Sequence, residues 1–129
     1  MRIIILLLLV ASSVAIACPS GGGDTIKVSG LVSLETFPGP PNYESIENGD
    51  RPEKYWILNL ENPMCFSPDS DFMGSEVTLS KMQLLLYKIK GKIKLEEGVK
   101  YEFIGATVPS HTGHHRTKVM LEVESYNRL

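Results

Sequence analysis

The sequence predicts an all-β fold in which five strands close into a small barrel. Residues 25–126 contain five segments with the apolar–polar alternation or the β-branched and aromatic enrichment that is typical of strands. A glycine lies inside the first segment, as it does where a long strand bends to close a barrel. The connection between the third and fourth segments is longer than a hairpin turn. With 129 residues, the chain has room for one domain.

Residues 1–17 have the pattern of an export signal. Arg2 precedes an apolar run over residues 3–10, and Ala15 and Ala17 form the A-x-A motif of a cleavage site. The run is shorter than the ~20 residues of a spanning helix, so no transmembrane segment is expected. We therefore expect an exported protein, periplasmic or secreted, with a mature chain that begins at Cys18.

The two cysteines, Cys18 and Cys65, predict a disulfide bond, because an even cysteine count in an exported chain favours pairing. Lipidation of Cys18, which would make the protein a lipoprotein with a lipid anchor, is the alternative. Ala15 stands where bacterial lipoprotein signals favour a large aliphatic residue, and lipidation would leave Cys65 unpaired. The net charge of −2 excludes the basic field that nucleic-acid binding requires.

The first half of the mature chain contains a leader and two strands. Residues 18–24 include three consecutive glycines and are expected to be flexible. Residues 25–36 alternate, with Ile26, Val28 and Val32 on one face and a bend expected at Gly30. Residues 54–66 begin with an aromatic and β-branched run and form the second predicted strand.

The second half contains three more strands within a single domain over residues 25–129. Residues 77–89 predict a strand, with a helix as the alternative because leucine and methionine favour helices. Residues 88–99 are a lysine-rich connection, in which one helical turn is expected near Leu95. Residues 100–108 and 118–126 alternate again and predict the fourth and fifth strands. The fold class is therefore all-β, or β with one short helix.

Five strands in this order match a barrel of the oligonucleotide/oligosaccharide-binding (OB) type. In that architecture, ligands bind at the loops after the first and fourth strands, which here are residues 37–50 and 110–117. We expect these two connections to lie on the same side of the barrel.

The connection 37–50 is the predicted binding loop. Its three prolines stiffen the backbone, so the polar and aromatic groups at its centre are held in a fixed pose and lose little entropy on binding. The candidate ligand-binding residues are Asn42, Tyr43, Glu44, Ser45 and Asp50. The alternative is a loop that caps one end of the barrel, with Tyr43 packed inward.

All three histidines of the chain fall within five residues, at His111, His114 and His115. This spacing could bring two or three imidazoles to one zinc or copper ion, which makes a metal site one hypothesis. Hydrogen bonds from the histidines to the nearby backbone are the other interpretation. A hydrolase that pairs a histidine with Ser110 or Asp50 is a third, although the chain contains no nucleophile elbow or phosphate-binding loop.

Several motifs resemble a bacterial exported domain of unknown function, family 4431. They are Thr36-Phe-Pro-Gly-Pro-Pro-Asn-Tyr-Glu-Ser-Ile46, Gly49-Asp50, Pro52-Glu53, Trp56-Ile-Leu58, Pro63-x-Cys65 and His111-Thr-Gly-His-His115. The resemblance implies a cysteine before the first strand that pairs with one after the second, which supports a Cys18–Cys65 bond. It assigns no activity. Some relatives carry a lysozyme-inhibitor-like segment beside this domain, which implies a binding role in the bacterial envelope.

Together these observations predict an exported, non-enzymatic binding domain. It would engage an envelope protein or a small ligand through residues 37–50 and 110–117. No cofactor is expected unless the histidines hold zinc or copper.

Overall fold

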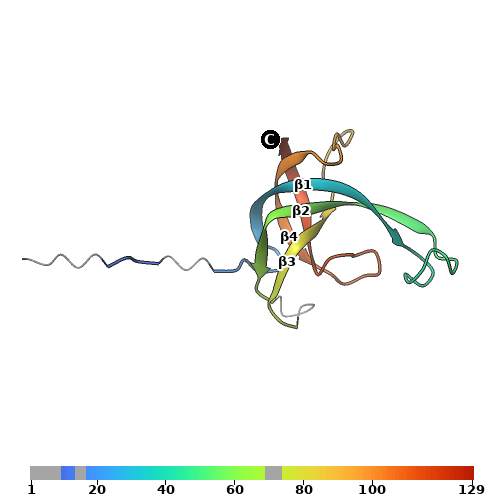
Figure 1. The fold of residues 1–129 in the computed structure, drawn as a ribbon, viewed down its shortest axis with the longest axis horizontal. Coiled ribbons are helices and arrows are strands. Elements are labelled where there is room, and N and C mark those ends of the chain that lie inside the picture. The colour runs from blue at the N-terminus through green and yellow to red at the C-terminus, as the bar shows by residue number, and fades with distance from the viewer. Residues whose placement is uncertain (1–9, 14–16, 69–73) are drawn as a thin grey trace, which may run out of the picture.

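A computed structural model describes residues 10–13, 17–68 and 74–129 of the chain. It contains five strands: β1 (Thr25–Pro38), β2 (Pro52–Phe66), β3 (Val77–Leu85), β4 (Lys100–Pro109) and β5 (Val119–Arg128). They close into a barrel in the order β1-β2-β3-β5-β4 (Figure 1). β3 and β5 run parallel and the other neighbours run antiparallel. The predicted five-stranded OB-like barrel is confirmed.

The connection between β3 and β4 contains no helix within the described part of the chain. β3 ends at Leu85, and residues 86–99 form turns and irregular segments, in place of the longer strand and the helical turn that were expected. Gly91 and Gly98 have φ values of 87° and 74°, which interrupt any helix. Ile89 and Leu95 pack against the core from this connection, which is why it lies close to the barrel.

The core is formed by the inward faces of all five strands. In β1 the predicted alternation is correct as far as Val32, with Ile26 and Val28 also buried, whereas Leu34 is exposed. Alternate residues of β4, together with Val119–Leu121 and Val123 of β5, complete the interior, and Phe103 and Leu121 have no exposed surface. Burial of this apolar surface is the main contribution to the stability of the barrel.

Gly30 marks the place where β1 changes neighbours. β1 pairs with β4 as far as Leu31 and with β2 from Gly30 onward. A Cβ atom at Gly30 would lie 1.9 Å from the Asn59 carbonyl oxygen, so a side chain cannot fit there. The predicted bend of the first strand therefore coincides with a close approach of two backbones.

The leader is fixed to the barrel by a disulfide bond between Cys18 and Cys65, whose Cα atoms are 5.2 Å apart. The Gly21 amide donates to the Ser67 carbonyl and the Gly23 amide to the Thr107 carbonyl. The predicted pairing of the cysteines is thus confirmed. Among the described residues, no helix is long and apolar enough to span a membrane. Most of residues 1–17, the predicted export signal, lie outside the described part of the chain.

β1 and β2 continue beyond the barrel as a two-stranded arm. The pairing of β2 with β3 begins at Ile57, but β1 and β2 stay paired as far as Pro38 and Pro52. In Figure 1 this arm extends away from the barrel, with residues 39–51 at its end. The arm carries the predicted binding loop away from the core.

Candidate functional site: the junction of the arm and the 110–117 turn

The arm and the turn between β4 and β5 meet through Tyr43 and His114. The Tyr43 hydroxyl lies 3.1 Å from Nε2 of His114, and the two rings pack edge to face with their centroids 5.3 Å apart. A Cβ atom at Gly113 would lie 2.9 Å from the Tyr43 ring, so only glycine lets the ring rest on the turn. The structure therefore brings the two connections that were expected to be neighbours into direct contact. We call this region the arm–turn junction.

Asp50 organises the loop at the end of the arm. Its carboxylate accepts hydrogen bonds from the backbone amides of Asn42, Glu44 and Ser45 at 2.8, 2.7 and 2.9 Å. The amide of Ser45, followed by that of Glu44, lowers the pKa of Asp50, because these bonds favour the charged form. Asp50 is 4% exposed, so it shapes the loop from inside.

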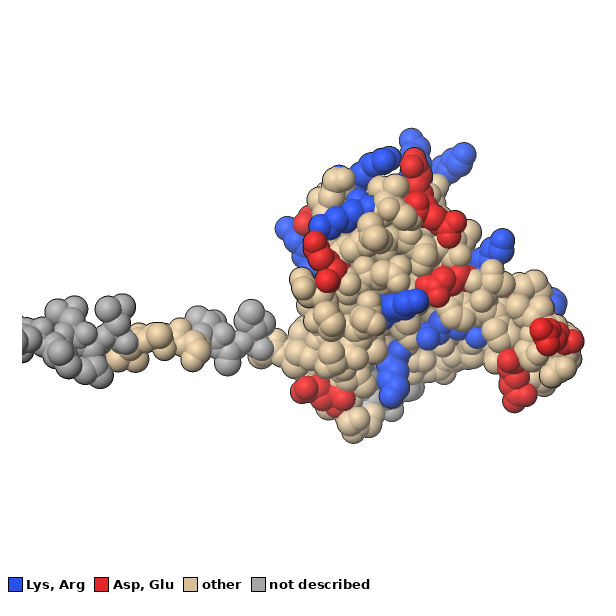
Figure 2. Space-filling view, viewed as in Figure 1, with Lys and Arg blue, Asp and Glu red and all other residues tan. Residues whose placement is uncertain are grey.

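The other candidate binding residues lie around this carboxylate. Asn42, Glu44 and Ser45 each donate a backbone amide hydrogen bond to Asp50. Ser45 is half-buried, whereas Asn42 and Glu44 are exposed, so their side chains are directed to solvent. Ile46, an apolar residue in the same loop, is 42% exposed. Figure 2 shows acidic side chains at the far end of the arm. The loop thus presents exposed groups on a backbone that is internally tied.

A buried amide, Gln83 of β3, holds the 110–117 turn. Its Nε2 donates to the His114 carbonyl at 3.1 Å and its Oε1 accepts from the Arg116 amide at 2.6 Å. The Gln83 amide donates to the Thr117 hydroxyl at 2.9 Å. Gln83 is 1% exposed. These bonds fix the backbone of the turn, and with it the direction of the His114 side chain.

His114 lies between two tyrosines and a glutamate. Its Nδ1 is 2.9 Å from Oε2 of Glu53 and 3.2 Å from the Tyr55 hydroxyl, which itself donates to Glu53. The hydrogen bond from Tyr55, and then that from His114, lowers the pKa of Glu53. Burial, and then the hydrogen bond to Glu53, raises the pKa of Tyr55 to about 12. At neutral pH the site therefore holds a charged Glu53 and a protonated Tyr55.

Arg116 lies in a box of three aromatic rings. The carbon at the centre of its guanidinium is 5.2 Å from the ring centroid of Phe37, 5.5 Å from that of Tyr43 and 5.6 Å from that of Tyr55. Its Nε and Nη2 atoms are buried without a hydrogen-bond partner in the described part of the chain. Cation–π attraction compensates for part of this lost hydration. The box joins the arm to the residue that follows the three histidines.

The structure directs the three histidines to different partners. His114 faces the arm, whereas Nδ1 of His115 accepts hydrogen bonds from the amides of His111 and Thr112 at 3.0 and 3.3 Å. The His111 and His115 rings are packed edge to face, with their centroids 4.5 Å apart. Burial, followed by the repulsion of His111 and His114, lowers the pKa of His115. Within the described ranges, no three His, Cys, Asp or Glu side chains are arranged to hold a metal ion.

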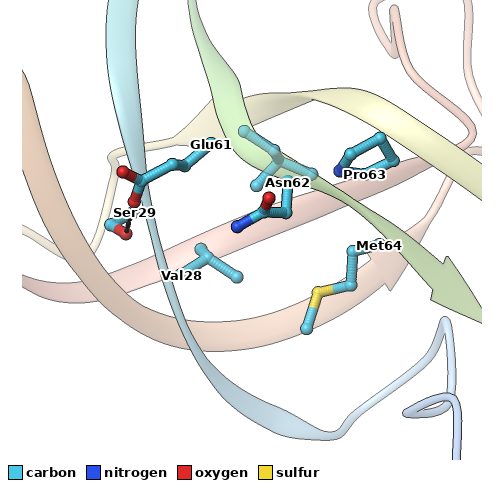
Figure 3. Close-up of a pocket in the computed structure, with 7 residues that line it drawn as sticks. Val28, Ser29, Glu61, Asn62, Pro63 and Met64 are labelled. Carbon is cyan, nitrogen blue, oxygen red and sulfur yellow. Dashed lines mark hydrogen bonds between the residues drawn. The ribbon is translucent and has the colours of Figure 1, made fainter.

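Hollows lie at the arm–turn junction and on the barrel. One, of about 310 Å³, is at the junction and is lined by Pro40, Arg51, Pro52, Glu53 and His114. A second, of about 210 Å³, lies on the barrel between β1 and β2 (Figure 3), and a third, of about 320 Å³, shares Leu60 and Glu61 with it. In the second hollow Glu61 already accepts hydrogen bonds from Ser29 and Lys100. The hollow at the junction is therefore the better candidate for recognition.

Sequence reasoning singled out Tyr43, Asp50 and His114 but missed Glu53, Tyr55, Arg116 and Gln83 as members of the site. Glu53 and Tyr55 are two residues apart on β2, so they share one face of the strand. That spacing was visible in the sequence, but Glu53 belongs to the same strand as Tyr55 only because β2 starts at Pro52 and not at Lys54. Ser110 and Asp50, the partners of the hydrolase hypothesis, bond to backbone atoms: the Ser110 amide donates to the Lys118 carbonyl, and Asp50 accepts from the loop.

No family model, curated protein or solved structure matches this chain, so its resemblance to family 4431 stays a prediction.

Proposed function

We propose that this chain is an exported binding domain that engages a protein of the bacterial envelope through the arm–turn junction. The observation that carries the proposal is the contact of the loop with the turn through Tyr43, His114 and Arg116. These contacts fix the shape of a surface that lies outside the barrel core. A surface that is already ordered loses little conformational entropy on binding.

The exposed groups on this surface support a protein partner over a small ligand. The loop presents the apolar side chain of Ile46 next to the exposed Glu44 and Glu47, and it projects away from the barrel (Figure 1). An apolar centre with a polar rim is the usual composition of protein interfaces. The hollow at the junction, of about 310 Å³, is of a size that suits one side chain of a partner.

Export is supported by the disulfide bond, because such bonds persist in oxidising compartments. Cell fractionation and N-terminal sequencing test this part of the proposal. We expect the protein in the envelope or medium, with Cys18 as the first residue and with no free thiol. A cytoplasmic protein that retains Met1 would contradict export.

Binding is tested by a photo-crosslinking amino acid placed at Ile46 and, as a matched control, at the exposed Thr78 of β3. We expect illumination of cells to give a protein adduct at position 46 and none at position 78. The partner, identified by mass spectrometry and purified, should bind the unmodified domain and lose at least about tenfold in affinity to Glu44→Lys. Equal adducts at both positions, or unchanged affinity, would count against the arm–turn junction.

A further inference from the structure

Three side chains at the arm–turn junction form a hydrogen-bonded row: Tyr43 from the loop, His114 from the turn and Glu53 from β2. The Tyr43 hydroxyl is 3.1 Å from Nε2 of His114, and Nδ1 of His114 is 2.9 Å from Oε2 of Glu53. A hydroxyl, an imidazole and a carboxylate in this order are the arrangement by which enzymes activate an oxygen nucleophile. Here the hydroxyl belongs to a tyrosine.

The hydrogen bonds determine which ring nitrogen carries the proton. A carboxylate only accepts hydrogen bonds, so Nδ1 of His114 donates to Glu53. In the neutral imidazole, Nε2 is then unprotonated and accepts the hydrogen bond of the Tyr43 hydroxyl. The free base of His114 is thus directed at the phenol, and Glu53 is placed to stabilise the imidazolium that forms when the phenol loses its proton.

Tyr43 is held in this position at a conformational cost. Its φ angle is 59°, in the left-handed region, and it is the one described residue other than glycine with a positive φ. A non-glycine residue in that region is strained and persists only where the surroundings compensate, often at functional sites. The Tyr43 ring packs against Gly113, and the Arg116 guanidinium lies 5.5 Å from the ring centroid. The positive charge of Arg116 would stabilise a negative charge that develops on the phenol.

We propose that Tyr43 is a nucleophile that accepts an acyl group from an activated ester, with His114 as the general base and Glu53 as the residue that positions it. The Tyr43 oxygen attacks the acyl carbon, its proton moves to Nε2 of His114, and the bond between the acyl carbon and the leaving oxygen breaks. The leaving oxygen either takes the proton from Nε2 of His114 and departs as an alcohol, or departs as a phenolate while the imidazolium gives the proton to solvent. The other product is an O-acyl tyrosine. The proposal goes beyond the binding function and does not depend on it.

Solvent can reach the row from one side. The His114 side chain is 52% exposed and that of Glu53 is 20% exposed, so the base is accessible while the carboxylate is largely covered. Tyr55, on the other side of the imidazole, donates its proton to Glu53 and has its pKa raised to about 12 by burial, so it stays protonated. The geometry therefore distinguishes Tyr43 from Tyr55 although both are close to His114.

Tyr87 provides an internal control. It is 68% exposed, more accessible than Tyr43, and its hydroxyl donates to the Glu122 carboxylate, with no histidine among the partners found for it. If accessibility alone determined acylation, Tyr87 would react first. General-base catalysis contributes about 10²–10⁴-fold, so the proposed mechanism predicts the opposite order.

The test is to treat the intact, disulfide-bonded protein with p-nitrophenyl acetate and to follow acetylation of each tyrosine by peptide mass spectrometry. We expect Tyr43 to be acetylated at least about 100-fold faster than Tyr87, with release of one p-nitrophenolate per acetyl group. His114→Ala should reduce the Tyr43 rate to that of Tyr87. Glu53→Gln, which keeps the His114 imidazole, should reduce the acetylation rate of Tyr43 by at least about tenfold. Tyr43→Phe should abolish the fast release of p-nitrophenolate.

The comparison of Tyr43 with Tyr87 needs no variant, so it is decisive even if His114→Ala disturbs the turn. Equal rates at the two tyrosines, or an acetyl group that appears on His114 and never on Tyr43, would overturn the proposal. An unchanged Tyr43 rate in a folded His114→Ala protein would do the same.

Discussion

The barrel and the arm–turn junction are built in different ways. In the barrel, many apolar side chains from five strands share one interior, and several, such as Phe66, Phe103 and Leu121, have no exposed surface. At the junction a few polar and aromatic groups each make a specific contact, as Asp50 does with three amides and Arg116 with three rings. The barrel therefore determines the free energy of unfolding, whereas the junction determines the shape of one surface.

The largest loss of stability is expected from Phe103→Ala in the centre of the barrel. Phe103 is fully buried and contacts Tyr101 and Tyr126 through ring centroids 6.0 and 5.8 Å away. Removal of the ring leaves a cavity and should lower the free energy of unfolding by about 3–5 kcal/mol. Urea denaturation measures this change. A loss below about 1 kcal/mol would show that the barrel interior is less tightly packed than described.

The second-largest loss of stability is expected from removal of the disulfide bond that joins the leader to the barrel. Cys18 and Cys65 are separated by 47 residues, so their bond restricts the unfolded chain strongly. Replacement of both by serine should lower the free energy of unfolding by about 3–4 kcal/mol in the chain-entropy model. Denaturation of the double variant, with and without a reducing agent, measures it. The reducing agent should destabilise the wild type and leave the variant unchanged.

A smaller effect is expected from Gly113→Ala at the junction. The added Cβ atom would lie 2.9 Å from the Tyr43 ring, so the ring or the turn must move. Because the Tyr43 side chain can shift without opening the core, the loss of stability should be only about 1 kcal/mol. NMR should show the signals of Tyr43 and His114 shifted and those of the barrel unchanged. Gly74→Ala, where no atom of the described residues lies within 4 Å of the new Cβ, is the matched control.

The smallest change in stability is expected when acid protonates Asp50 in the loop at residues 39–51. The folded-state pKa of Asp50 lies below its ordinary value, so its hydrogen bonds contribute stability fully above about pH 4 and lose it as the pH falls through the lower, folded-state pKa. The amide signals of Asn42, Glu44 and Ser45 should therefore change together in acid, before the barrel unfolds. Asp50→Asn should remove this shared transition. Its persistence in that variant would assign it to another carboxylate.

The sequence predicted the barrel well because alternation reports directly on a buried face. Val119, Leu121 and Val123 were expected to point inward, and all three are fully buried. The junction was predicted only as two neighbouring connections, because its contacts depend on the length of the arm. The chain pattern suggested that the strands end at Thr36 and begin at Lys54, whereas their pairing continues to Pro38 and Pro52. Those extra residues bring Phe37 and Glu53 to the site.

The histidine spacing illustrates the same limit. Three imidazoles close in sequence suggested a shared ion, but side-chain direction depends on backbone bonds that the sequence does not display. The hydrogen bonds of Gln83 orient the turn so that His114 faces the arm, while His115 turns back to the amides of its own turn. A glutamine inside an apolar run was the one visible sign that a buried amide would be needed there.

The Cys18–Cys65 bond encloses β1, the loop and β2 in one covalent ring. A protease that cuts the exposed loop, for example after Glu47, would therefore not release a fragment, because both ends of the cut remain joined through the sulfur atoms. The nicked protein would migrate as two pieces on a gel only after reduction. The exposed loop can thus be cut without loss of a fragment, and the domain keeps all its strands.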